Sequence, residues 1–242
     1  MDEVDELARA VRAGLAGLSD PGKASSMRRY MKSEMPFRGV PKPARRILTR
    51  RLFAEHRLPD RESFVSAALR LWREAEFREE RYVAIDLTGD RRYARWQDAT
   101  LLPLYDELIV TGAWWDYVDE VAIHRVGPLL RTDQGTLTPV IRRWANDDDR
   151  WRRRSSVICQ VGSKKDTDIG LLTATVEANL GGRDFFLRKA IGWALRDYAK
   201  TDPGWVSAFV ATHPGLSPLS RREALKNVAT ASEVRNGGHG EH

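Results

Sequence analysis

The sequence predicts an all-α fold in which short helices stack in pairs to form a repeat superhelix. Apolar residues recur at the i, i+3/i+4, i+7 spacing of a buried helix face along nearly the whole chain. Alternating strand patterns are almost absent. The links between apolar stretches are short and carry helix-start signals, so each amphipathic helix must bury its apolar face against a neighbour.

The predicted helices are defined by their apolar stripes. In chain order these stripes are Ala44, Ile47, Leu48 and Leu52; Val65, Ala68, Leu69 and Trp72; Leu101, Leu104, Tyr105 and Leu108; Leu137, Val140, Ile141 and Trp144; Ile169, Leu172, Val176 and Leu180; and Leu187, Ile191, Ala194 and Tyr198. The segment 155–161 is β-branched, but Trp151, Ser155 and Ile158 keep the helical period. We therefore expect a helix there too.

Helix starts are predicted at Asp20-Pro21, Asp202-Pro203 and Ser217-Pro218, where a capping side chain precedes a proline suited to the first turn. Ser220 and Glu223 have the spacing of a capping box. About a dozen helices, at roughly 35–45 residues per pair, suit degenerate helical repeats. A compact irregular bundle is the alternative. We expect a single domain over residues 1–231 and a disordered tail over 232–242.

The composition is that of a globular protein, with 42% hydrophobic and 31% charged residues in 242. The sequence has no apolar stretch of transmembrane length and no secretory leader, and its single cysteine, Cys159, suits a reducing compartment. We therefore expect a cytoplasmic, nucleoid-associated protein. The five histidines have no metal-ligand spacing, and phosphate-loop, dinucleotide, zinc-protease and hydrolase motifs are absent.

The positive charge is concentrated in clusters. The formal net charge is +6, and residues 21–52 contain ten Lys/Arg against one acid, Glu34. Further clusters are 150–154 and 183–189, and aromatic residues lie among them. This pattern is typical of nucleic-acid-binding proteins. An ordinary solvated basic surface is the alternative.

Two residues in the predicted helix over 112–130 lie off its apolar stripe. Trp115 and Asp119 are four apart and share a second helix face. A tryptophan beside a carboxylate can stack on a cationic ligand while the acid supplies negative charge. A partly buried tryptophan next to a surface acid is the simpler interpretation.

The helix over 184–200 has the same kind of pattern. Phe186 and Trp193 lie seven apart on a face that also holds Lys189. Two aromatic rings and a lysine suit a base or sugar and its phosphate. Packing against the next helix pair explains them equally well.

Several basic residues are candidate phosphate contacts. Arg154 precedes an apolar stripe at an expected helix start, where the helix dipole disfavours a cation, so binding a phosphate or lying along the apolar surface are both open. Arg153 belongs to the same cluster. Tyr30 and Lys32 lie among other basic residues near the N-terminus, a mixture that suits contact with a nucleic-acid backbone.

Taken together, these segments resemble the HEAT-like-repeat alkylpurine DNA glycosylases of the DNA alkylation repair family. The resemblance covers roughly residues 5–228 in family order and is most specific at two strings, WWDYVD and FFLRKAIGW. The matching segments are Tyr30–Lys32, Pro36–Val40, Trp114–Asp119, Arg153–Ser155, Lys165–Asp168, Phe185–Arg196 and Pro218–Ala224.

The resemblance implies an α-superhelix with a concave basic cleft that binds duplex DNA, without metal or cofactor. Nothing in the sequence suggests an obligate oligomer, so we expect a monomer. It implies base excision repair by hydrolysis of the N-glycosidic bond of purines such as 3-methyladenine and 7-methylguanine. By position, Trp115, Asp119 and Trp193 would form the catalytic set. The DNA contacts would include Arg154, Tyr30, Phe186, Lys189, Arg153 and Lys32.

Hydrolysis of the N-glycosidic bond of an alkylated purine needs only a few catalytic residues. A purine alkylated at N3 or N7 is cationic and leaves as a neutral base, so the enzyme chiefly has to stabilise an oxocarbenium-like sugar and supply water. Asp119 is expected to provide the charge and orient the water, while the two tryptophans stack on the cationic nucleotide. A non-catalytic DNA-binding superhelix and a scaffold for a protein partner are the alternatives.

Overall fold

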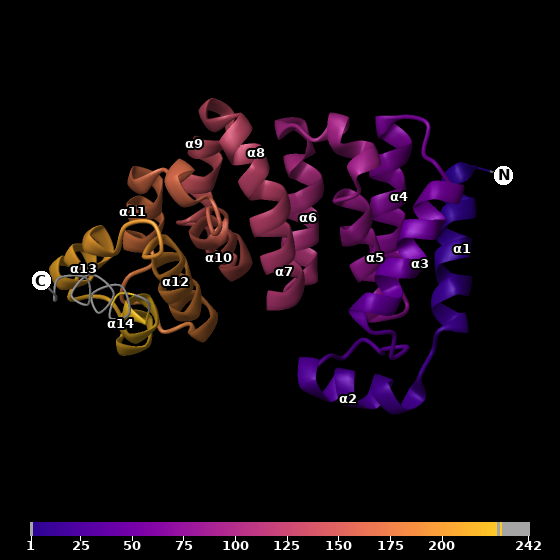
Figure 1. The fold of residues 1–242 in the computed structure, drawn as a ribbon, viewed down its shortest axis with the longest axis horizontal. Helices are drawn as coiled ribbons and strands as arrows, with labels where there is room; N and C mark the ends of the chain where they lie inside the picture. Colours follow the sequence, from indigo (N-terminus) through magenta and orange to yellow (C-terminus); the bar gives the residue numbers. More distant parts are fainter. Residues whose placement is uncertain (1, 227, 229–242) are drawn as a thin grey trace, which may run out of the picture. The chain divides into compact units, whose positions relative to one another are not determined.

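The structure is a computed structural model that describes residues 2–226 and 228. Its backbone contacts divide the chain into two compact units, Met1–Gln97 and Asp98–His242. Every regular element in the described residues is a helix, which confirms the all-α prediction (Figure 1). The predicted disordered tail lies outside the described residues, and the single domain over 1–231 stays a prediction.

The first unit is built on four helices that lie side by side, with a fifth crossing their ends. In Figure 1 the crossing helix, α2, lies across the lower ends of the other four. The elements are α1 (Glu3–Gly17), α2 (Pro21–Met31), α3 (Lys42–Glu55), α4 (Arg61–Arg73), α5 (Arg78–Thr88) and the 3-10 helix η1 (Arg91–Trp96).

The core of the first unit follows the amphipathic pattern. Helix α1 has three acids in its first turn, a side-chain cap from Asp2, and a buried apolar face that includes Leu7 and Val11. It packs against α4, which buries Phe64 and Leu71. Val65 and Leu69, which were placed on the α4 stripe, are only half-buried because the buried face is rotated toward Phe64.

The predicted stripe on α3 is partly wrong. Leu48 and Leu52 are buried as expected, but Ile47 is 74% exposed. The buried face of α3 includes Arg45 instead, whose guanidinium bonds Asp86 at 2.8 Å and lies 4.7 Å from the centre of the Tyr82 ring. A buried arginine, paired with the half-buried Asp86, takes the place that hydrophobicity alone assigned to isoleucine.

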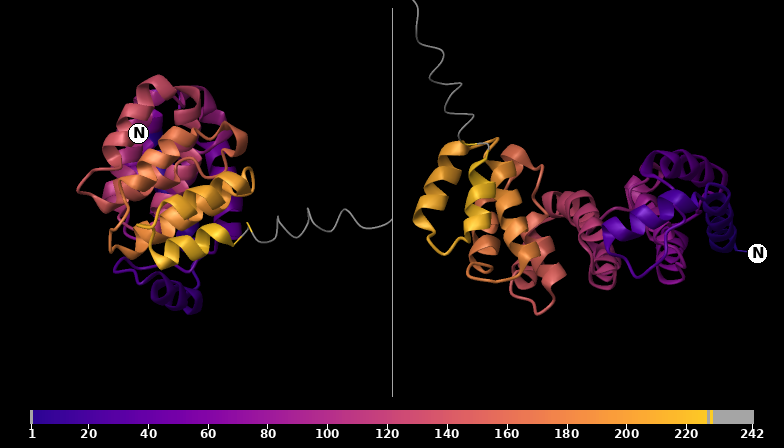
Figure 2. Two further views of the ribbon diagram at one scale, coloured as in Figure 1. Left: turned by 90° about the vertical axis from the view of Figure 1, so that its left-hand side faces the viewer. Right: turned by 90° about the horizontal axis from the view of Figure 1, so that it is seen from below.

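The second unit contains the remaining elements, from the short helix η2 to α14; Figure 2 gives two further views of the chain. They are η2 (Ala99–Leu101), α6 (Leu102–Gly112), α7 (Trp115–Val121), the π-helical segment η3 (Ala122–Val126), α8 (Gly127–Thr132), α9 (Gln134–Trp144), α10 (Arg150–Ile158), η4 (Lys164–Asp166), α11 (Ile169–Glu177), α12 (Phe185–Tyr198), α13 (Pro203–Thr212) and α14 (Pro218–Leu225).

Helix α10 is central to the second unit. It packs against α6, α7, α9, α11 and α12. The β-branched stretch 155–161 is helical as predicted up to Ile158, where α10 ends, and residues 159–161 form a turn. Trp151, Ser155 and Ile158 are all buried. On α12 the whole predicted stripe from Leu187 to Tyr198 is buried. The side chains of α10 are therefore positioned between neighbouring helices on several sides.

A π-helical segment joins α7 to α8 without a break. Pro128, at the start of α8, has no N–H to donate to the carbonyl of His124 four residues earlier. That carbonyl instead accepts a bond from the Arg125 guanidinium at 2.8 Å. The missing backbone bond accounts for the local widening, since kinks and π segments arise where the i to i−4 ladder is interrupted.

The predicted helix starts at Asp20, Asp202 and Ser217 are confirmed, since each side chain caps its helix. The capping box is wrong, because Ser217 is the cap and Ser220 lies inside α14. Ile169, predicted to be on a buried stripe, is 37% exposed at the first position of α11.

Within the described residues, none of the helices combines the length and the apolar character that crossing a membrane would require.

Candidate functional site

Arg154 occupies the centre of the second unit. Asp149 accepts bonds from the backbone of Trp151 and Arg152, so α10 begins at Arg150. Arg154 is therefore the fifth residue of α10 and not at a helix start, which corrects the sequence-based expectation. From there it points between α7 and α12, and it is only 5% exposed.

Asp119 of α7 forms a two-point ion pair with Arg154. The Nε and Nη2 groups of Arg154 donate to the two carboxylate oxygens at 2.7 and 2.8 Å, and Nη1 donates to the carbonyl of Phe186 on α12 at 2.5 Å. Bidentate pairs of this kind fix both side chains in orientation. Three helices thus meet at one guanidinium.

The charge on Asp119 is set by opposing effects. Burial raises the pKa of the Asp119 carboxyl above its ordinary value of 3.8, while the hydrogen bonds and charge of Arg154 oppose that rise and the nearby Asp116 adds to it. The side chain remains 15% exposed. A carboxylate in this position is partly accessible and can face a positive charge that develops in a ligand.

The two tryptophans of the candidate set are both half-buried. Trp115 is the first residue of α7, one helical turn before Asp119, and follows a sharp turn in which Ala113 adopts a left-handed conformation with φ 45°. Trp193 lies on α12, two turns beyond Phe186, and packs in part against the core of the second unit. Each residue is therefore partly accessible.

Phe186 belongs to an aromatic cluster. Its ring centre lies 5.6 Å from that of Trp114 and 5.1 Å from that of Trp151, so for this residue packing between helices is the observed role. Neighbouring Phe185 meets Phe186 edge-on at 5.6 Å and is 59% exposed. The cluster fixes the start of α12, whose Phe186 carbonyl binds Arg154.

The other basic candidates in the second unit have protein partners. Lys189 is 43% exposed and lies 3.5 Å from Glu223 of α14. Arg153 donates to the Asn179 side chain at 2.8 Å and is half-buried. Both retain an accessible portion, so contact with an anionic ligand is compatible with these pairs.

Tyr30 and Lys32 belong to the first unit. Tyr30, on α2, is 76% exposed. Lys32 ends α2 in a left-handed conformation with φ 49° and is exposed as well. The two are therefore candidate contact residues on the surface of the first unit.

Sequence reasoning missed the pairing of Asp119 with Arg154, because nothing in the chain signals a contact between positions 35 apart. It also missed three consecutive buried charged residues, Arg78, Glu79 and Glu80, at the start of α5. Among the residues that the structure describes, no group of three or more His, Cys, Asp or Glu has the arrangement of a metal site.

Comparison with known proteins identifies relatives over most of the chain. The sequence matches the model of the family described as "DNA alkylation repair enzyme" over residues 11–228. A solved structure, titled "Predicted DNA alkylation repair enzyme from Enterococcus faecalis", is similar with a TM-score of 0.79 and 30% identity, and the match covers 87% of this chain and 97% of that one. A search of curated proteins gave no match.

Proposed function

The chain belongs to the DNA alkylation repair enzyme family, and from this premise we propose that it is a DNA glycosylase. Its substrates are N3- and N7-alkylated purines, such as 3-methyladenine and 7-methylguanine, in duplex DNA. It hydrolyses the N-glycosidic bond and releases the damaged base, which is the first step of base excision repair.

The ion pair of Asp119 with Arg154 is the observation that carries this proposal. An N-alkylated purine is already cationic and leaves as a neutral molecule, so no strong general acid is required. Positive charge develops on the deoxyribose instead, as in glycoside hydrolysis. Asp119 is a preorganised negative charge that can stabilise this sugar and orient the attacking water.

Arg154 supplies the link to the DNA backbone. A guanidinium has five N–H groups, and three of those on Arg154 are used by Asp119 and the Phe186 carbonyl. The remaining two can donate to a phosphate next to the lesion. Contact with a phosphate would draw part of the guanidinium charge away from Asp119, so the carboxylate becomes more available to the sugar.

Trp115 and Trp193 provide selectivity for the cationic lesion. Aromatic faces attract a cation by about 0.5–2 kcal/mol each, and normal purines lack the positive charge. Both residues are half-buried, so part of each is accessible to a ligand. Excision of a neutral lesion such as uracil by the unaltered protein would contradict this mechanism.

The test is base release from a duplex that contains one 7-methylguanine. We expect release by the unaltered protein and a loss of about a hundredfold in Asp119→Asn, equivalent to about 2.7 kcal/mol in the barrier. Glu120→Gln, which removes a charge at the next position of α7, is the matched control and should retain activity.

The two negative outcomes have different meanings. If the unaltered protein binds the duplex but releases neither 7-methylguanine nor 3-methyladenine, the chain is a non-catalytic DNA-binding member of its family. If release occurs and Asp119→Asn retains it, the reaction stands and the role given to Asp119 is wrong.

A further inference from the structure

Helix α2 is the most exposed helix of the first unit. Met31 is its only fully buried side chain, and α2 crosses the ends of the other helices without joining their layer (Figure 1). The stretch 21–33 contains four Lys/Arg and no acid. Packing of an apolar face therefore explains little of why α2 has a fixed position.

The exposed face of α2 has the composition of a phosphate-binding surface. Ser25, Ser26, Arg29 and Tyr30 are all exposed, and their spacing places them on one side of the helix. Hydroxyl groups, tyrosines and arginines are common donors to DNA phosphates. Lys32 extends this α2 face at the C-terminal end of the helix.

The segment after α2 attaches the helix to the rest of the unit. Asp20, the cap of α2, donates its N–H to the carbonyl of Arg38 at 2.8 Å. Gly39 has φ +84°, and a Cβ there would lie 2.0 Å from the Asp20 carbonyl oxygen. Only glycine permits so close an approach, so the segment 38–40 lies directly against the first turn of α2.

Glu79 holds this segment from the other side. Its carboxylate accepts the backbone N–H groups of Arg38, Gly39 and Val40, with the shortest contacts at 3.0, 2.8 and 3.0 Å, and the residue is fully buried. Three amides converging on one buried carboxylate form a strong charge-assisted anchor.

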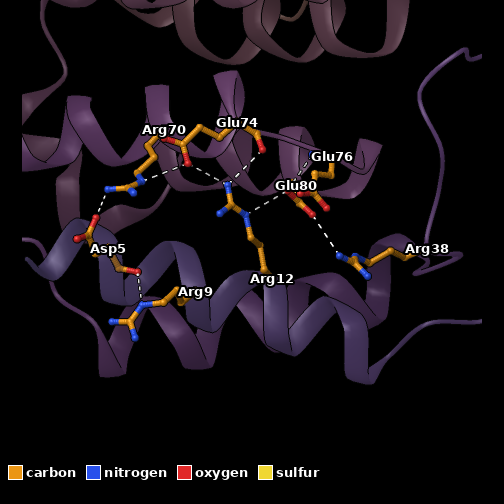
Figure 3. Close-up of polar contacts among 8 residues, drawn as sticks. All are labelled: Asp5, Arg9, Arg12, Arg38, Arg70, Glu74, Glu76 and Glu80. Carbon is orange, nitrogen blue, oxygen red and sulfur yellow. Dashed lines mark hydrogen bonds and ion pairs between the residues drawn. The ribbon is translucent and has the colours of Figure 1, made fainter. Parts of the chain in front are cut away.

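The residues on either side of Glu79 act on the same segment. Arg78 donates its backbone N–H to the Pro36 carbonyl at 2.9 Å and its guanidinium to the Ser33 hydroxyl at 3.3 Å. Glu80 lies 3.5 Å from the Arg38 guanidinium and 3.6 Å from Arg12, a chain of ion pairs shown in Figure 3. Three consecutive charged residues of α5 are thus buried against 33–40.

Burying charges is costly unless they are fully paired, so the buried residues Arg78, Glu79 and Glu80 imply that the position of segment 33–40 matters. Because this segment lies against α2, fixing it also fixes α2. The family resemblance already makes Tyr30 and Lys32 of this face expected DNA contacts. We propose that Glu79 is the positioning residue for them, since it fixes the segment that holds the exposed face of α2 toward the sugar-phosphate backbone of duplex DNA. This inference rests on the DNA-binding part of the proposed function but not on base release.

The first experiment measures binding of an undamaged duplex over a range of salt concentrations. The variant Arg29→Ala/Lys32→Ala changes only exposed side chains and should leave the fold intact. If both cations contact phosphates, the slope of log K against log[salt] becomes shallower by about 0.9 for each lost contact. An unchanged slope overturns the surface assignment, whether or not the protein proves to be a glycosylase.

The second experiment tests Glu79 as a positioning residue. Glu79→Gln keeps the shape but replaces one accepting oxygen by a donor facing the 38–40 amides. We expect about tenfold weaker duplex binding and a shallower salt slope. Glu62→Gln removes an exposed charge from α4 of the same unit and should bind normally.

Comparing the loss of DNA affinity caused by Glu79→Gln in two backgrounds separates a positioning role from general damage to the fold. In the Arg29→Ala/Lys32→Ala background, Glu79→Gln should cause no further loss, because the contacts that it positions are already absent. Equal losses in both backgrounds would overturn the role of Glu79. If Glu79→Gln does not fold, amide hydrogen exchange of residues 21–33 in the unaltered protein decides: DNA must protect them, and a lack of protection refutes the proposal.

Discussion

Arg154 reaches both carboxylate oxygens of Asp119 at 2.7 and 2.8 Å, although the two residues lie on different helices, α10 and α7. The third bond of the guanidinium, to the carbonyl of Phe186, adds α12 to the same point. The pair therefore has a structural role, joining three helices, as well as the chemical role that we propose. Experiments on either residue have to separate these roles.

Replacing Arg154 by alanine should destabilise the protein strongly. The change leaves the Asp119 carboxylate buried without its partner, and breaking one side of a buried pair costs about 3 kcal/mol or more. Urea unfolding followed by circular dichroism would measure the loss. Arg153→Ala, which removes a half-buried arginine with one bond to Asn179, is the control and should cost about 1 kcal/mol.

The double variant Arg154→Ala/Asp119→Asn completes this test. Because it removes both charges, it should be more stable than Arg154→Ala alone. If the loss of unfolding free energy in the double variant equals the sum of the losses in the two single variants, the interaction between Arg154 and Asp119 does not contribute to stability.

The pH dependence of base release should follow Asp119. Its pKa is raised above 3.8 by burial, so the carboxylate loses its charge at a higher pH than an ordinary aspartate does. The rate should therefore fall as the pH drops through a value above 3.8. The free energy of unfolding changes in the opposite direction. A folded-state pKa above the unfolded one stabilises the fold at low pH, and this stabilisation is lost as the pH rises through the folded-state pKa of Asp119.

Single-turnover rates measured from pH 4 to 8, after subtraction of spontaneous base loss, would test this. The residual activity of Asp119→Asn should lack the acidic limb. An acidic limb of the same midpoint in that variant would assign the titration to another group.

The helices were predictable because their signals are local. The α12 stripe from Leu187 to Tyr198 repeats at the helical period, and the caps at Asp20 and Asp202 lie next to the residues they cap. Where the prediction for α3 failed at Ile47, the cause is the burial of Arg45 in an ion pair with the half-buried Asp86, which a hydrophobic pattern cannot show.

The sequence proposes candidate residues but does not show their geometry. Trp115, Asp119 and Trp193 lie off the apolar stripes and match a family pattern, and their catalytic role stays a prediction. Nothing in the sequence indicates that Arg154 pairs with Asp119. Nothing in the sequence marks Glu79 as a buried residue, because an acid in the first turn of a helix is ordinarily exposed. Contacts between residues distant in sequence depend on how helices pack, and local patterns do not encode that.

Gly192 should be intolerant of a side chain. A Cβ at this position of α12 would lie 2.5 Å from the Cβ of Glu223 and 3.1 Å from the carbonyl oxygen of Ser220, both on α14. Gly192→Ala therefore has to push α14 away and should cost about 1–3 kcal/mol of stability. Because Trp193 is the next residue, the change should also lower base release in proportion to the displacement of that ring.

Thermal unfolding and base-release rates would measure both effects. Gly135→Ala is the matched control, since a Cβ on this helical glycine of α9 would meet only the Asp133 carboxylate, at 3.9 Å. It should be neutral or slightly stabilising. If Gly192→Ala is equally neutral, the close packing of α12 and α14 does not fix the position of Trp193.

Lys32 should show opposite effects on stability and on DNA binding. It ends α2 with φ 49°, a left-handed conformation that glycine adopts readily but that costs other residues about 1 kcal/mol or more. Lys32→Gly should therefore raise the unfolding free energy or leave it unchanged, while it removes an ammonium group from the proposed phosphate-binding face of α2.

Lys32→Ala keeps the strain and removes the same charge, so it is the matched comparison. Both variants should weaken duplex binding to the same extent and reduce the salt slope by about 0.9, but only the glycine variant should gain stability relative to the alanine one. If the two differ in DNA affinity in step with their stability, the lysine acts through the fold of α2 and not through contact with DNA.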